Sequence, residues 1–79
     1  MERRKVIELD VREDLKNKLE PFQKIMEAVK ELNQMNDTFI LHAPFKPVPL
    51  FAVLKAKGFS HEAEEIEAKH WMVTFIKNS

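Results

Sequence analysis

The sequence predicts an α/β two-layer sandwich (an α+β fold) with the element order β-α-β-α-β-β. Three observations predict this class. Apolar and polar residues alternate in separate short segments, which is typical of strands with one buried face. Two other segments begin with proline and repeat apolar residues at helical spacing. The chain has 79 residues, enough for one small core. We therefore expect a single domain over residues 1–79, with both helices on one face of a mixed four-stranded sheet.

The first strand is predicted at residues 5–11, KVIELDV, where apolar and polar positions alternate. Its buried face would consist of Ile7, Leu9 and Val11. The following segment REDLKNKLE, residues 12–20, has no clear period and predicts a loop. The first helix is predicted to begin at Pro21, because proline suits the first helical turn. Its inward stripe has helical spacing and consists of Phe22, Ile25, Met26, Val29 and Leu32.

The second strand is predicted at residues 37–43, DTFILHA, which alternates in the same way. Pro49 is predicted to begin the second helix, as Pro21 begins the first. Its inward stripe would consist of Leu50, Val53 and Leu54. Gly58 is the single glycine, and it stands where a left-handed residue commonly ends a helix.

The last third of the chain predicts a hairpin. Residues 60–67, SHEAEEIE, have helix-forming composition and some helical spacing, but we interpret them as a polar edge strand. The reason is that residues 70–76, HWMVTFI, predict a clear strand, and a strand needs a neighbour. The turn would lie near Lys69. Two right-handed crossovers would make the first three strands parallel, and the hairpin would make the fourth antiparallel.

The composition excludes several functions. Lys plus Arg and Asp plus Glu number 13 each, and this balance disfavours nucleic acid as a partner. The chain has no cysteine, which excludes disulfides, thiolate metal sites and cysteine nucleophiles. No apolar run reaches the length of about 20 residues that a membrane span needs, and no signal-peptide core is visible. We therefore expect no membrane association and a cytoplasmic location.

Three motifs carry a family resemblance. LDVR (9–12) and EPF (20–22) resemble the small sulfur carriers of the TusA/SirA type, and the third motif, HAPFKPVPLFAVLKAKGF (42–59), joins them in a closer resemblance. More closely, the chain is similar over about residues 7–77 to an uncharacterised bacterial and archaeal family related to those carriers. The resemblance implies a TusA/SirA-like fold. Members of that family occur alone or joined to hemerythrin-like or cupin domains, which implies a role in redox, sulfur or nitrogen-oxide metabolism.

The resemblance lacks the residue that carries sulfur. In the sulfur carriers a Cys-Pro pair opens the first helix, and the helix N-terminus favours the thiolate that holds a persulfide. The matching residues here are Glu20 and Pro21. A carboxylate cannot carry a persulfide, so the resemblance implies the fold without the sulfur relay. We expect a non-catalytic binding or interaction module in which Glu20 interacts with the helix dipole. A further hypothesis, ranked third after the metal- or haem-linked domain described below, is an enzyme that uses Glu20.

Cationic side chains and free amides are predicted to gather where the parallel strands end. Ligands of open α/β sheets collect at this edge. No side-chain cap precedes Pro49, so the first N–H groups of the second helix are expected to be free. A small anion or an acidic peptide is the predicted ligand. The predicted site consists of Arg12, His42, Lys46, Leu50, Phe51 and Ala52. The alternative is that water caps the helix and the cations are solvated.

The sheet face away from the helices is predicted to be more apolar than a solvated face. It would carry Val6, Thr38, Ile40, His42, Met72 and Ile76. A docking surface for a protein partner or a homodimer is one interpretation. The alternative is a solvated face with scattered apolar residues, which is common.

Histidine and methionine residues support a second hypothesis. HEAEE, residues 61–65, resembles the HExxH zinc helix, but glutamate at position 65 leaves the ligand set incomplete. We therefore expect no metal and no cofactor. The alternative is a metal- or haem-linked accessory domain. Its ligands would come from His42, Met72, His61 and His70.

Overall fold

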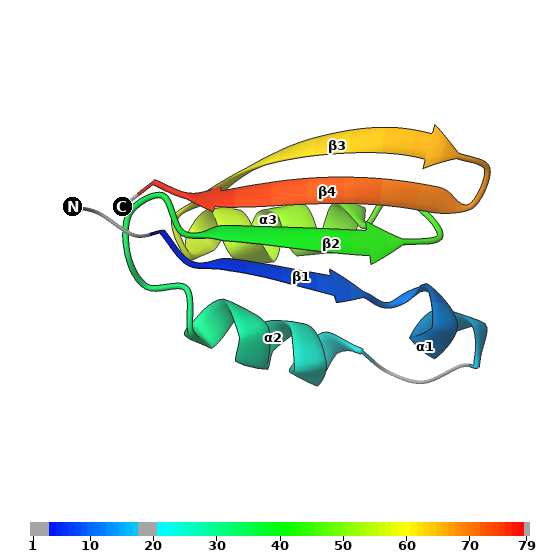
Figure 1. Cartoon of the computed structure of the whole chain (residues 1–79), viewed down its shortest axis with the longest axis horizontal. Coiled ribbons are helices and arrows are strands. Elements are labelled where there is room, and N and C mark those ends of the chain that lie inside the picture. The colour runs from blue at the N-terminus through cyan, green and yellow to red at the C-terminus, as the bar shows by residue number, and fades with distance from the viewer. Residues whose placement is uncertain (1–3, 18–20, 79) are drawn as a thin grey trace.

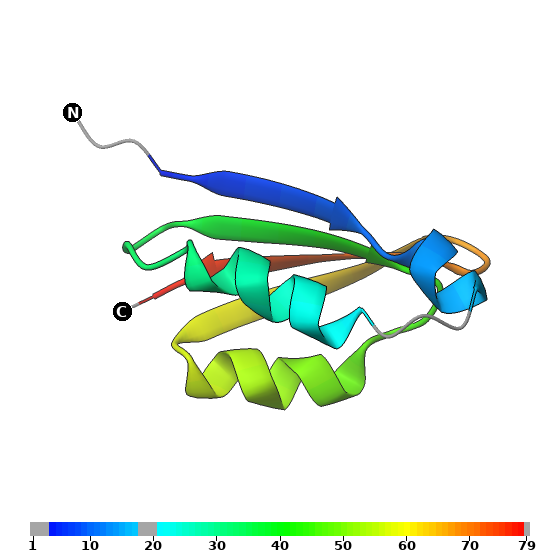
Figure 2. The ribbon, with the colours of Figure 1, turned by 90° about the horizontal axis from the view of Figure 1, so that it is seen from below.

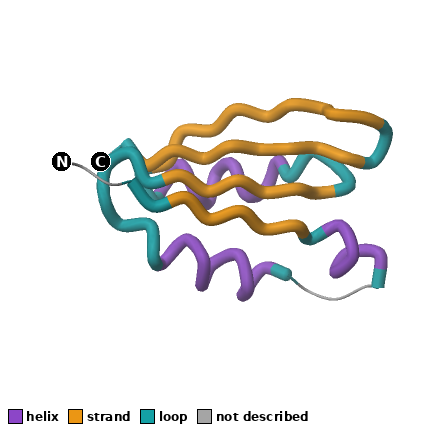
Figure 3. Tube along the Cα trace, in the orientation of Figure 1, coloured by secondary structure: helices purple, strands orange, loops and turns teal. Residues whose placement is uncertain are grey.

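A computed structural model describes residues 4–17 and 21–78 as four strands and three helices (Figures 1 and 3). In chain order they are β1 (Val6–Asp10), α1 (Arg12–Lys16), α2 (Phe22–Lys30), β2 (Thr38–Ala43), α3 (Val48–Ala56), β3 (Phe59–Glu67) and β4 (His70–Lys77). Apart from α1, this is the predicted order. The segment that could have been helix or strand is a strand, β3.

The strands form one sheet in the order β1-β2-β4-β3. β1 and β2 are parallel, and β4 is antiparallel to both of its neighbours, β2 and β3. The first three strands therefore run in the same direction, and β3 is an edge strand, as predicted. Figure 2 shows α2 and α3 on the same side of the sheet. The predicted α+β class, with a mixed four-stranded sheet and the two main helices on one face, is confirmed.

The short helix α1 corrects the loop prediction for residues 12–20. The N–H of Leu15 donates to the Val11 carbonyl at 3.0 Å, and the N–H of Asn17 donates to the Glu13 carbonyl at 3.0 Å. Leu15 packs against the core, which stabilises this single turn. Five residues are too few to show a helical period, so the pattern gave no signal. Residues 18–20 of that prediction lie outside the described residues.

The core lies between the sheet and the two longer helices. Its sheet side follows the predicted alternation, with Phe39, Leu41, Val73 and Phe75 fully buried. The helices add Ile25, Val29 and Leu54, and Leu32 adds to the core just after the end of α2. Phe22 is the exception to the predicted inward stripe, because its side chain is 46% exposed at the start of α2.

Candidate functional site

A pocket of about 220 Å³ lies at the edge of the sheet where the parallel strands β1 and β2 end and where α2 and α3 begin. Among the residues that the structure describes, every lining residue is apolar. The lining residues are Val11, Leu15, Pro21, Phe22, Ile25, Leu41, Ala43, Phe45, Pro47, Pro49, Leu50 and Val53. This is the edge at which the sequence predicted a ligand, but the structure makes it apolar.

The segment HAPFKPVPLF, residues 42–51, builds one wall of this pocket. Ala43 is the smallest of the inward side chains of β2, so the sheet surface drops where the strand ends. Pro47 and Pro49 add rigid apolar rings to the wall, and because proline has no backbone N–H, these two residues add no hydrogen-bond donor to the pocket. Phe45 stands between them and the strand, with 51% of its side chain exposed. Proline therefore shapes the pocket as well as starting α3.

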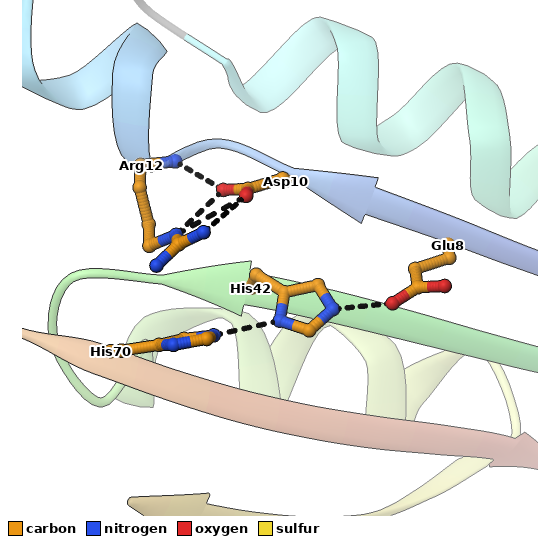
Figure 4. Close-up of polar contacts among 5 residues, drawn as sticks. All are labelled: Glu8, Asp10, Arg12, His42 and His70. Atoms are coloured by element: carbon orange, nitrogen blue, oxygen red, sulfur yellow. Dashed lines mark hydrogen bonds and ion pairs between the residues drawn. The ribbon is translucent and has the colours of Figure 1, made fainter. Parts of the chain in front are cut away.

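The cations of the predicted anion site have separate partners. Arg12 pairs with Asp10 through Nη2 to Oδ2 at 2.8 Å and Nε to Oδ1 at 3.0 Å (Figure 4). The hydrogen bond from Arg12 lowers the pKa of Asp10 to about 2. The same bond raises the pKa of Arg12. Lys46 has its Nζ 5.9 Å from the centre of the Trp71 ring. His42 lies on the other face of the sheet, so these three side chains do not surround one point.

The amides of the predicted anion site are also partly occupied. α3 begins at Val48, one residue before the predicted start, and the N–H of Leu50 donates to the Pro47 carbonyl at 3.0 Å. This amide is therefore not free. The Phe51 ring lies 3.9 Å from the His61 ring, measured between centroids, so it packs against β3. The small-anion site stays a prediction.

Of the Glu-Pro pair, the described chain includes only Pro21. Glu20 lies outside the described residues. Pro21 precedes α2, lines the pocket, and accepts a hydrogen bond from the N–H of Ile25 at 2.9 Å. The start of this helix therefore faces an apolar wall.

A chain of polar side chains crosses the opposite face of the sheet. Nδ1 of His42 lies 3.0 Å from Nε2 of His70, and Nε2 of His42 lies 2.5 Å from Oε2 of Glu8 (Figure 4). The three residues come from β2, β4 and β1. The His42 side chain is only 16% exposed, so its ring is held by both neighbours.

The four histidine and methionine residues of the second hypothesis divide between the two faces. Met72 stands directly opposite His42 in the β2–β4 pair, so Met72, His42 and His70 share the open face. His61 stands opposite Phe75 and stacks on Phe51, on the helix side. Over residues 4–17 and 21–78, no group of three or more histidine, aspartate or glutamate side chains is arranged to hold a metal ion.

The sequence model of one protein family matches residues 8–77. It describes uncharacterised conserved proteins and is designated DUF2249. This chain belongs to that family. The expected membership in an uncharacterised family is thereby confirmed, whereas the relationship of DUF2249 to the TusA/SirA sulfur carriers stays a prediction. No curated protein and no solved structure matches the chain. None of the helices in the described part of this DUF2249 protein has the length and apolar character of a membrane span.

Two functional features of this DUF2249 protein were not predicted. The alternation of β1 puts Glu8 on the face opposite Ile7 and Leu9, but the contact of Glu8 with His42 was not predicted. The signal was available, because a parallel pairing of the first two predicted strands brings their polar positions together. No sequence pattern predicts the apolar pocket, because the pocket is the space that side chains from several elements leave unfilled when they pack together.

Proposed function

We propose that this protein is a non-catalytic binding module whose pocket receives one large apolar side chain of a protein or peptide partner. The observation that supports this proposal is the lining, which consists of apolar side chains only within residues 4–17 and 21–78. Such a pocket offers burial to a ligand, and the described residues supply no nucleophile, acid or base at its wall.

The size of the pocket supports a single anchor group. Pockets for drug-sized ligands measure about 300–1,000 Å³, and a cavity of about 150 Å³ accepts benzene. At about 220 Å³, this pocket fits one aromatic or branched aliphatic side chain. Phe22 and Phe45 line the pocket and are half exposed, and exposed Val48 lies between the lining residues Pro47 and Pro49, so the apolar surface continues outside the pocket.

The energy of one anchor explains why a larger partner is expected. Burying one large apolar side chain contributes about 1.5–3 kcal/mol, whereas a Kd of about 1 mM requires about 4 kcal/mol. The pocket alone would therefore bind weakly, and contacts with the exposed Phe22 and Phe45 have to add to it. A role in redox, sulfur or nitrogen-oxide metabolism and a cytoplasmic location remain predictions from the family resemblance and the composition.

The test is an amide-shift titration with millimolar N-acetyl-tryptophanamide and N-acetyl-leucinamide. We expect saturable shifts at Leu41, Leu50 and Val53. Val53→Phe should reduce them by filling the pocket, and Phe45→Ala should weaken binding. Met35→Ala is the matched control, because Met35 is 60% exposed and does not line the pocket. The absence of shifts around the pocket, or equal binding by Val53→Phe, would contradict the proposal.

The open sheet face supports a second candidate, docking of a basic protein partner. Its strand residues include five carboxylates and neither Lys nor Arg, although Arg12 pairs with one of the five, Asp10. The carboxylates, which flank Ile40, Met72 and Ile76, are Glu8, Asp10, Glu62, Glu64 and Glu67. An apolar centre between carboxylates matches a surface with an apolar centre and cations at its rim. A homodimer through this face is less favourable, because like charges would meet.

The docking proposal is tested with a synthetic amphipathic helix of leucine and lysine. Fluorescence anisotropy should show binding that the double variant Glu62→Lys/Glu64→Lys weakens by at least tenfold. The control, Glu27→Lys/Glu31→Lys, makes the same change in net charge on the helix side. Equal loss in both variants would indicate unspecific attraction and contradict the proposal. A salt-resistant dimer in sedimentation would instead favour a second copy of the chain.

A further inference from the structure

We propose that His42 and His70 bind one Cu(I) ion on the open sheet face, with Met72 as the third ligand and Glu8 orienting His42. The inference does not depend on the proposed function, because the apolar pocket lies on the other side of the sheet. It also differs from a site built from all the histidines, since His61 is excluded by its position.

The hydrogen bonds determine where the lone pairs point. A carboxylate can only accept a hydrogen bond. When both imidazole rings are neutral, Nε2 of His42 therefore carries the proton and donates this hydrogen bond to Glu8. Nδ1 of His42 then presents its lone pair to Nε2 of His70. In the metal-free pair, His70 donates the proton of Nε2. When that proton moves to Nδ1 of His70, both lone pairs point to the same place and the total number of bound protons is unchanged.

The distance between the two nitrogens suits a shared ion. Nitrogen ligands stand about 2.0–2.1 Å from a metal such as zinc, and at a tetrahedral angle this places two of them about 3.3 Å apart. The observed separation is 3.0 Å. Small rotations of the side chains would open this gap. His42 lies within the central strand β2, whereas His70 is the first residue of β4 beside the hairpin turn, so the His70 ring is the one that can turn toward a shared ion.

The remaining donor is soft. Met72 is the cross-strand partner of His42 and lies two residues from His70 on the same face of β4. Partners of this kind have Cβ atoms about 4.5–5.5 Å apart, within reach of a thioether. Thioether ligands select Cu(I) among the first-row ions. A structural zinc site would need four protein ligands, and the described residues do not supply a third histidine or carboxylate.

The surroundings favour a cation. Glu8 contacts the far nitrogen of His42, which is the arrangement that orients histidine ligands in known metal sites. Glu64 stands opposite Met72 on β3 and adds a second negative charge at this place. The carboxylate next to His42 therefore both orients the ring and compensates the charge of the ion.

The test is an anaerobic Cu(I) titration of tag-free protein against a competing chelator such as bicinchoninate. We expect one Cu(I) per chain in the wild type. Glu8→Gln should weaken binding by about 10–100-fold, and His42→Gln and His70→Gln should weaken it further. Met72→Leu should weaken Cu(I) binding while leaving any Zn(II) binding unchanged. Amide spectra of each variant verify that the sheet remains folded.

His61→Gln is the matched control, because it removes the third histidine of the chain from the opposite face. It should bind Cu(I) like the wild type and bind the apolar probes of the pocket unchanged or nearly so. The proposal is overturned if the wild type binds Cu(I) no more tightly than His42→Gln. Equal losses in His61→Gln and His70→Gln would overturn it too.

Discussion

Asp37 shows how much one side chain contributes to the architecture. It is buried, and its carboxylate accepts the N–H of Lys5 at 2.9 Å and the N–H of Gln34 at 3.1 Å. Its backbone carbonyl accepts the N–H of Lys77 at 2.9 Å. One residue thus connects the chain before β1, the turn after α2 and the end of β4. The hydrogen bond from Lys5, followed by that from Gln34, lowers the pKa of the Asp37 carboxyl.

The lowered pKa of Asp37 predicts acid sensitivity. The unfolded chain takes up this proton at the ordinary pKa of 3.8 and the folded chain at a lower pH. The stabilising contribution is therefore complete above pH 3.8 and is lost as the pH falls through the folded pKa. Urea unfolding should show Asp37→Asn less stable than the wild type at pH 7, with a smaller difference near pH 2. Glu27→Gln, on the exposed face of α2, is the control. A constant difference at all pH values would contradict this account.

The sequence was sufficient at the residue scale where side chains alternate. Ile7, Leu41 and Phe75 lie on the predicted faces because a pleated strand directs successive side chains to opposite sides. It was insufficient for Phe22, which continues the apolar stripe of α2 but lies at the first turn, where it lines the open pocket and stays 46% exposed. Helical spacing gives the direction of a side chain, and the reach of the neighbouring element decides its burial.

At the scale of elements, the junctions follow from residue types. Gly58 has φ 91° and joins α3 to β3, with its N–H donating to the Lys55 carbonyl at 3.0 Å. Its predicted role as the left-handed end of a helix therefore agrees with the geometry. The start of α3 was predicted one residue too late, because Val48 enters the first turn ahead of Pro49. Proline marks the first turn of a helix without specifying its first residue.

The conformation of Gly58 predicts a graded stability series. A residue with a Cβ atom pays about 1–2 kcal/mol in the left-handed region, and asparagine tolerates that region better than alanine. Gly58→Ala should therefore destabilise the protein by about 1–2 kcal/mol, and Gly58→Asn by less. Chemical denaturation measures both. Equal stability of Gly58→Ala and the wild type would show that the junction relaxes to a different conformation.

At the scale of the whole molecule, zero net charge conceals a separation of charge. The strand residues of the open sheet face carry carboxylates and no Lys or Arg, whereas α2, α3 and their C-terminal ends carry four lysines against the two carboxylates Glu27 and Glu31. The lysines are Lys24, Lys30, Lys55 and Lys57. Composition alone suggested no electrostatic preference for a partner. The arrangement of strands and helices separates the charges into two faces that would attract different partners. The sequence therefore predicted the docking surface from its apolar residues, whereas its negative charge became visible only in the fold.

The position of β4 has a consequence for biosynthesis. β4 is the last strand along the chain, yet it lies between β2 and β3 in the sheet. While the ribosome is still making residues 70–77, β2 and β3 have no strand between them to pair with. Only the β1–β2 pair can form early. The sheet therefore closes only after β4 has been made, and until then the apolar faces and unpaired strand edges of the nascent chain are exposed to aggregation.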